Sequence, residues 1–168
     1  DHLPYCSSVC CITALKQALQ VKEQDPDANV FVVYKELRTP GQAEDIYRKA
    51  QEEGVTFIRC QAPEVKADTD KLAVEAEDEL LGESVTLEDL DMVVLSVGLE
   101  PGEGTEQVRR LLSLSQTSDG FLTESHPKLM PVDAPTRGVF LAGCVEAPKD
   151  IKDSVTRLVP PLPEAQFY

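Results

Sequence analysis

The residues best suited to chemistry are three cysteines near the start of the chain, Cys6, Cys10 and Cys11, in the run Tyr-Cys-Ser-Ser-Val-Cys-Cys. They open an apolar pattern of helical spacing, so three sulfurs should lie near one point. Thiolates gathered in this way are typical ligands of iron–sulfur clusters or zinc. Three ligands are one short of the usual four. Either Cys60 or Cys144 completes the site, or a ligand precedes residue 1, and we favour the second.

Other interpretations of these cysteines stay open. They can form a buried structural group or a surface group, because unligated cysteine is commonly buried. Zinc is awkward for the adjacent pair Cys10 and Cys11, since a tetrahedral metal holds its ligands well apart. A thiol–disulfide enzyme would need a cysteine of low pKa with a resolving partner, and a vicinal pair forms only a strained disulfide.

Composition bounds the class of protein. The 168 residues suffice for one domain or two half-domains, and 42% of them are hydrophobic, as in a globular chain. A net charge of −14 argues against nucleic-acid binding and against anionic membrane surfaces. No apolar run approaches the length of a membrane span, and no signal peptide opens the chain, so direct membrane insertion is not expected.

The cysteine count and the N-terminus suggest the context. Five cysteines, an odd and clustered number, do not resemble a disulfide framework, which favours a reducing, cytoplasmic setting. The chain starts at Asp-His-Leu-Pro and runs almost directly into a helix. We therefore expect a fragment from which a preceding strand has been cut away.

The elements that must position the cysteines alternate as in an α/β fold. A helix is predicted from about Val9 to the turn at Asp25-Pro26, followed by a buried strand over 30–34. A second helix is predicted over 43–53 and a second strand over 55–60. This order is typical of a right-handed α/β crossover with a parallel sheet.

The rest of the chain changes character. Alternating polar and apolar residues predict an antiparallel meander over 64–87 with one face in water. Buried strands are predicted at 92–98 and 138–143, and short helices at 105–114 and 151–157.

Several motifs, in this order, resemble a known group of flavoproteins. Residues 94–101, 119–121 and 138–143 resemble the C-terminal half of thioredoxin-reductase-like flavoproteins. The chain up to about residue 157 is more similar still to the A subunit of heterodisulfide reductase. It is also similar to the related flavoprotein subunits of the quinone-interacting membrane-bound oxidoreductase complex. The stretches that carry this resemblance are Pro4–Cys11, 51–59, 126–129 and 142–154.

The resemblance implies cofactors and ligands. In that family the Cys-x3-Cys-Cys group and one upstream cysteine hold a [4Fe–4S] cluster, so Cys6, Cys10 and Cys11 would be metal ligands and the fourth would lie upstream. The strand ending in Ala-Gly points toward FAD, so the resemblance implies a flavin site lined by a set of five residues from this end of the chain. These are Gly143, Cys144, Asp150, Ile151 and Ser154. Asp150 has a second interpretation, as the cap of a helix.

The resemblance also implies an organisation into domains. Residues 1–100 would be a Rossmann-like segment without its first strand, and 101–157 the C-terminal portion of an FAD-binding domain. Residues 158–168 form a proline-rich tail that does not match the helix the family has there. No G-x-G-x-x-G fingerprint is present, so independent NAD(P)H binding is not expected. The loop at Arg38, Thr39 and Gly41 follows a predicted strand, where ligands of such sheets commonly bind.

The predicted function is electron transfer within a flavin and iron–sulfur oxidoreductase subunit, with no catalytic acid or base in this fragment. The predicted partners are other subunits of a redox complex, which can itself be attached to a membrane. A non-catalytic docking domain is the alternative. A sheet that lacks an edge strand can also pair with a second copy, so a homodimer stays open.

Overall fold

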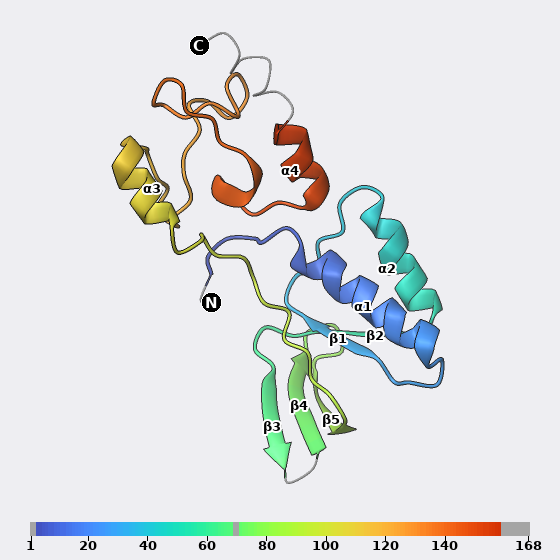
Figure 1. Ribbon diagram of the computed structural model, residues 1–168. Coiled ribbons are helices and arrows are strands. Elements are labelled where there is room, and N and C mark those ends of the chain that lie inside the picture. The colour runs from blue at the N-terminus through green and yellow to red at the C-terminus, as the bar shows by residue number, and fades with distance from the viewer. Residues whose placement is uncertain (1–2, 69–70, 159–168) are drawn as a thin grey trace. The chain divides into compact units, whose positions relative to one another are not determined.

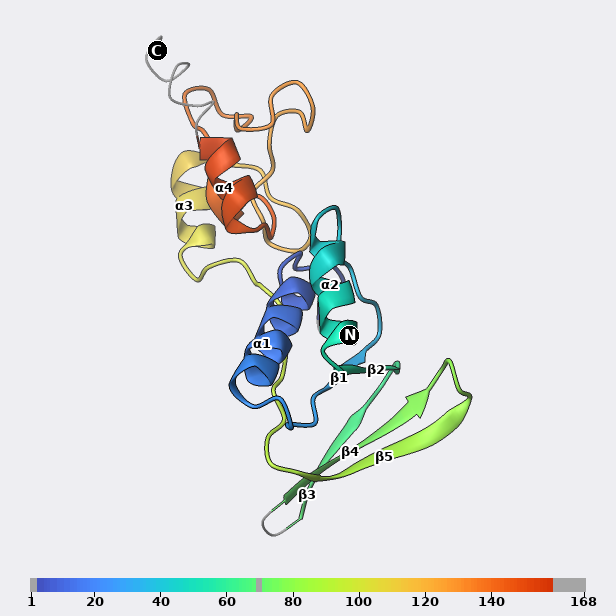
Figure 2. The same cartoon turned by 90° about the vertical axis from the view of Figure 1, so that its right-hand side faces the viewer.

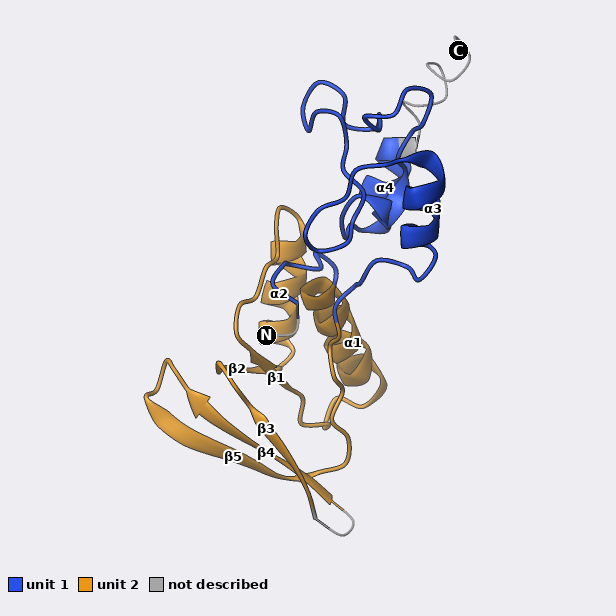
Figure 3. Cartoon of the chain, turned by 90° about the vertical axis from the view of Figure 1, so that its left-hand side faces the viewer, with its two compact units in different colours: residues 1–9, 98–168 blue, residues 10–97 orange. Residues whose placement is uncertain are grey.

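The computed structural model describes residues 3–68 and 71–158 of the chain. Residues 1–2, 69–70 and 159–168, the last of which belong to the predicted tail, lie outside these ranges. The chain divides into two compact units, one of residues 10–97 and one of residues 1–9 with 98–168 (Figure 3). The predicted boundary at residue 100 separates a Rossmann-like segment from part of an FAD-binding domain, and that assignment stays a prediction.

The unit of residues 10–97 begins with the predicted helix–strand–helix–strand order (Figure 1). Its elements are α1 (Cys10–Gln24), β1 (Phe31–Tyr34), α2 (Ala43–Glu52), β2 (Thr56–Arg59), β3 (Glu64–Asp68), β4 (Lys71–Asp78) and β5 (Glu83–Leu90). β1 and β2 pair in parallel, and β3, β4 and β5 form an antiparallel sheet in that order. The predicted α/β class, parallel pair and meander are confirmed.

α1 and α2 pack on one face of the β1–β2 pair. Leu15, Ala18 and Leu19 are buried at the helical spacing that the sequence shows, and they join Ala50 of α2 and Val55. Val32 and Phe57 of the strands pack against the same cluster. The helices lie side by side in both views (Figures 1 and 2).

The opposite face of the same strands packs against the meander. Val33 and Ile58 are one residue along from Val32 and Phe57, so their side chains point the other way. They form a second core cluster with Cys60, Ala76 and partly buried residues of β5. The two strands are therefore covered on both faces, by helices on one and by β4 and β5 on the other.

The unit of residues 1–9 and 98–158 has little regular structure in its described part. It contains α3 (Thr105–Leu112), the 3₁₀ turn η1 (Gly143–Val145) and α4 (Ile151–Leu158). Its core joins Leu114, Leu122, Ala134 and Leu141. Isolated bridges, such as Asp133 to Phe140, replace longer ladders.

Two strand predictions are wrong. Residues 92–98 form no strand, and Met92, Val94, Leu95 and Val97 are two-thirds to three-quarters exposed. Among the described residues no strand pairs with this run, so its apolar side chains have no sheet neighbour to cover them. Residues 138–143 contribute one bridge and the buried Leu141, because their backbone bonds go to a loop rather than to a strand.

The burial expected for β1 is also only partly met. Phe31 is exposed, and Val32 to Tyr34 are half-buried.

Within residues 3–68 and 71–158, no helix is both long and apolar enough to cross a membrane.

Replacing Leu15 by Ala tests the core under α1. Leu15 is fully buried between α1, α2 and Val55, so the change should lower the free energy of unfolding by about 2–5 kcal/mol. Urea denaturation followed by circular dichroism measures it. The exposed Leu81 of the same unit supplies the control, and Leu81→Ala should cost below about 0.5 kcal/mol. Equal losses in the two variants would contradict this packing.

Candidate functional site

The three predicted ligands lie on either side of the start of α1. Cys10 and Cys11 are the first two residues of the helix and are half-buried, whereas Cys6 is exposed. Cys6 belongs to the unit of residues 1–9 and 98–168, and Cys10 and Cys11 belong to the other unit. The Sγ of Cys6 accepts a hydrogen bond from the Ser8 N–H at 3.4 Å, and Ser8 has a left-handed φ of 62°.

Two hydrogen bonds join the first turn of α1 to other segments of its own unit. The Cys11 thiol donates to the backbone oxygen of Glu36 at 3.7 Å, in the loop after β1. The Ser96 hydroxyl donates to the backbone oxygen of Cys10 at 3.3 Å. The exposed run at 92–98 is thus tied to the first turn of α1.

The segment that carries Cys6 is fixed by one backbone residue, Leu99. The buried Ser7 hydroxyl accepts a hydrogen bond from the Leu99 N–H at 2.8 Å, and the Tyr5 hydroxyl donates to the Leu99 carbonyl at 2.9 Å. Desolvation, with the charges of Glu100 and Asp119, raises the pKa of Tyr5, so its hydroxyl stays protonated and can donate. The Tyr5 ring also meets Phe121 edge to face at 5.3 Å.

Gly98 allows this close approach. A Cβ at residue 98 would lie 2.5 Å from Cδ1 of Leu3 and 2.6 Å from Oγ of Ser7. Both distances are too short for real contacts, so a larger residue must displace the side chains of Leu3 and Ser7, which lie on either side of Cys6 along the chain. Sequence reasoning missed this glycine, because nothing nearby in the chain signals the contact.

The donor set suits an iron–sulfur cluster, although the described side chains do not by themselves complete a site. Thiols are the ligands that such clusters take, and the first turn of α1 contains no acidic residue. In the described part of the chain, no group of three or more His, Cys, Asp or Glu side chains is placed to hold a metal ion.

Cys60 is placed away from this chemistry. Its side chain is buried with Ile58 and Ala76, so it acts as a core residue of the unit of residues 10–97. That placement disfavours Cys60 as the fourth ligand.

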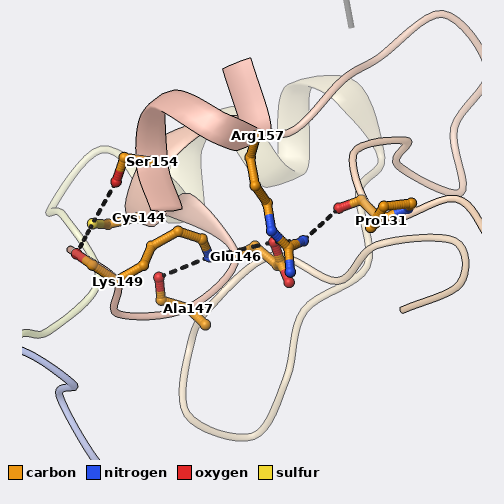
Figure 4. A network of polar contacts seen from close by, with 7 residues as sticks. All are labelled: Pro131, Cys144, Glu146, Ala147, Lys149, Ser154 and Arg157. Atoms are coloured by element: carbon orange, nitrogen blue, oxygen red, sulfur yellow. Dashed lines mark hydrogen bonds and ion pairs between the residues drawn. The ribbon is translucent and has the colours of Figure 1, made fainter. Parts of the chain in front are cut away.

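The predicted flavin residues gather at the start of α4. The Cys144 thiol donates to the backbone oxygen of Lys149 at 3.4 Å and lies 3.9 Å from the Ser154 hydroxyl (Figure 4). Gly143 has a φ of +68°, and among the described atoms none would lie within 4 Å of a Cβ there. Ile151 is largely exposed. An open backbone beside a turn and a helix start is compatible with close approach of a cofactor.

Asp150 caps α4. Its Oδ1 accepts the Asp153 N–H at 2.7 Å, and its backbone oxygen accepts the Ser154 N–H at 3.0 Å. The capping interpretation of this residue therefore fits its contacts.

A buried ion-pair network behind this turn is absent from the sequence predictions. Glu146 is 12% exposed and lies 2.7 Å from Arg157 and 3.4 Å from Lys149, whose side chain is 7% exposed. Arg157 also donates to the Pro131 carbonyl at 2.7 Å, and Lys149 donates to the Ala147 carbonyl at 3.2 Å (Figure 4). The network links α4 to the loops at 131 and 146. The position of Arg157 on the predicted helix is the one sequence signal for this network, because its other members lie in irregular segments.

Gly98→Ala should destabilise the segment that carries Cys6. Overpacking against Leu3 and the buried Ser7 should cost about 1–3 kcal/mol. The control is Gly102→Ala, whose Cβ would meet only Thr105 Oγ1 at 3.9 Å among the described atoms. Amide hydrogen exchange at Leu99 reports the opening of the segment. Unchanged exchange at Leu99 in Gly98→Ala would contradict the importance of this close contact.

Glu146→Gln should loosen α4. The change leaves the buried Lys149 without its counter-charge and should cost about 3 kcal/mol. Glu106→Gln is the control, because that exposed carboxylate also binds two cations, Arg109 and Arg110, and its loss should matter clearly less. Hydrogen exchange of the α4 amides measures the first effect and that of α3 the second. Similar losses would show that burial of the network is not decisive.

Comparison with known proteins places the chain. No protein-family model matches it. It is 48% identical over 157 residues to the A subunit of the H(2):CoB-CoM heterodisulfide,ferredoxin reductase of Methanothermobacter thermautotrophicus, covering 92% of this chain and 24% of that protein. It is 43% identical over 157 residues to the iron-sulfur A subunit of the CoB–CoM heterodisulfide reductase of Methanocaldococcus jannaschii, covering 91% and 24%.

A third relative agrees. The A subunit of the ferredoxin/F(420)H(2)-dependent CoB-CoM heterodisulfide reductase of Methanosarcina acetivorans is 44% identical over 154 residues, covering 91% of this chain and 19% of that protein. The chain thus spans about a quarter or less of the length of these relatives. The resemblance seen in the motifs is confirmed: this chain matches a segment of the A subunit of heterodisulfide reductase.

Proposed function

We propose that this chain is an electron-transfer segment of a flavoprotein subunit of the heterodisulfide reductase A type. Cys6, Cys10 and Cys11 would supply three ligands of a [4Fe–4S] cluster, and residues 143–154 would line FAD. The observation that carries the proposal is the position of Cys10 and Cys11 in the first turn of α1, with Cys6 four residues before Cys10. The names of the relatives, which mention iron–sulfur or ferredoxin, support it.

The start of α1 favours thiolates. Backbone N–H groups at a helix N-terminus carry partial positive charge, which stabilises negatively charged ligands nearby. α1 has no acidic side chain in its first turn, although the chain as a whole has a net charge of −14. Negative ligands at Cys10 and Cys11 therefore meet no acidic side chain in the first turn of their own helix.

The two hydrogen bonds to Leu99 hold the third ligand. They fix the chain on both sides of Cys6, at Tyr5 and Ser7, and so limit where its sulfur can point. The fourth ligand would come from outside residues 3–158, because Cys60 is buried in a core and Cys144 is engaged beside α4.

The flavin would contact the turn from Gly143 and the start of α4. Gly143 offers an open backbone, Cys144 and Ser154 lie beside each other, and the Glu146 network holds the turn from behind. When bound, the cluster and the flavin supply the electron chemistry, while the chain sets their position and surroundings. The partners would be other subunits of the redox complex.

A docking domain without redox cofactors is the second candidate. The observation that favours it is the exposed apolar run at Met92, Val94, Leu95 and Val97, since such patches commonly contact other polypeptide surfaces. In that case the cysteines would carry no iron.

The two candidates differ in iron content. In the full-length polypeptide, purified without oxygen, the double variant Cys10→Ser, Cys11→Ser should lose about four iron atoms per chain, with the matching visible absorbance. Cys144→Ser is the control, because Cys144 is not among the proposed ligands, and it should keep the wild-type iron content.

A double variant that retains all its iron and folds as the wild type does would overturn the cluster assignment and favour the docking domain. Loss of iron in Cys144→Ser as well as in the double variant would place the ligands elsewhere.

A further inference from the structure

The loop after β1 borders a pocket that the electron-transfer proposal does not use. The pocket holds about 500 Å³ and lies at the carboxyl ends of the parallel strands, where Tyr34 pairs with Arg59. Ligands of parallel α/β sheets bind at that edge. Its size is within the range of small-molecule sites. Its lining includes Tyr34, Lys35, Glu36, Arg38, Tyr47 and Arg59.

The charge of this pocket differs from that of the whole chain. Its lining includes three cations, Lys35, Arg38 and Arg59, and two carboxylates, Glu36 and Glu44. The chain as a whole is strongly acidic, at a net charge of −14. With Glu79, which pairs with Arg59, the cations and carboxylates here are equal in number, so this site lacks the negative excess of the rest of the chain.

One carboxylate already uses these cations. Glu36 accepts two hydrogen bonds from Arg38, at 3.1 Å from Nε and 2.5 Å from Nη2. The Arg38 hydrogen bond and then the Arg38 charge hold the pKa of Glu36 below its usual value. Desolvation opposes them, and the charges of Lys35 and Arg59 add weaker lowering effects. Lys35, Arg38 and Arg59 all line the pocket together with Glu36.

An external anion can replace the carboxylates in these ion pairs. Arg38 and Glu36 are each 59% exposed in their side chains, and an exposed pair contributes little to stability. Arg59 is paired in the same way with Glu79 at 3.0 Å. A phosphate carries more charge than a carboxylate and matches the two N–H groups of an arginine.

Two aromatic side chains in the lining indicate which chemical group a bound phosphate would carry. Tyr34 and Tyr47 both line it, and each meets Phe57 edge to face, at 6.4 Å and 4.9 Å. The Tyr47 hydroxyl also accepts a hydrogen bond from Gln51 at 3.1 Å, which helps to fix the ring. Fixed aromatic rings beside cations are a common arrangement for nucleotides.

We propose that this pocket binds a nucleoside monophosphate, with the phosphate at Arg38, Lys35 and Arg59 in place of the Glu36 carboxylate and the base beside the two tyrosines. The chain has no dinucleotide fingerprint, so the proposal is limited to a mononucleotide. It goes beyond the electron-transfer function, and neither cofactor is needed for it.

The test is a titration of the 168-residue chain with AMP, and separately with inorganic phosphate, followed by amide NMR shifts. AMP should shift residues 35–39 and Arg59 saturably and bind about tenfold more tightly than phosphate, because of the base. Arg38→Gln should weaken AMP binding about tenfold, and Glu36→Gln should tighten it, since the internal competitor is gone.

Lys66→Gln is the matched control, because it removes one exposed positive charge from β3, in the same unit but outside the pocket lining. It should leave AMP affinity within about twofold. The gain in Glu36→Gln cannot result from misfolding.

Absence of saturable shifts with AMP at millimolar concentrations would overturn the site. Equal affinity for AMP and phosphate would overturn the nucleotide assignment. Equal weakening of AMP binding in Arg38→Gln and Lys66→Gln would show that AMP responds only to the overall charge of the chain, and would overturn the role of Arg38. None of these outcomes depends on iron or flavin, so they are independent of the electron-transfer proposal.

Discussion

Both polar groups of the Leu99 backbone are bonded to side chains of the segment that carries Cys6, and the candidate site depends on this double hydrogen bond. Ser7 accepts from the N–H and Tyr5 donates to the carbonyl, across more than ninety positions of sequence. Gly98 lets the two segments meet. Each such hydrogen bond contributes about 0.5–1.5 kcal/mol net, and the two together tie Leu99 to the segment of Cys6. It therefore fixes the segment of Cys6. This cysteine lies four residues before Cys10, the first residue of α1.

The unit of residues 10–97 depends on a parallel pair of strands covered on both faces. Because alternate residues of β1 and β2 point to opposite sides, four-residue strands serve two cores at once. The same strand ends place Arg38 and Arg59 together at one edge. The thiols at the start of α1 and the pocket after β1 thus both depend on one short sheet and the elements next to it. The Cys11 thiol is bonded to the loop that contains Glu36.

Periodicity in the sequence was enough to predict the helices and the meander, because each buries one face at a regular spacing, as Leu15 and Leu19 do in α1. It failed at Met92–Val97, where an apolar run normally means a buried strand but no described strand pairs with it. Cysteine spacing indicated the candidate ligands. The Glu146 network and the contact at Gly98 join distant, irregular segments, and such contacts leave no local pattern to read.

The central claim is that these cysteines bind iron, and anomalous diffraction at the iron edge tests it most directly. Crystals of the full-length polypeptide, grown without oxygen, would be measured on both sides of that edge. We expect an iron peak within bonding distance of the sulfurs of Cys6, Cys10 and Cys11, completed by a fourth ligand from outside residues 3–158. An ordered cysteine segment with no iron beside it, or with iron bound only by other residues, would contradict the claim.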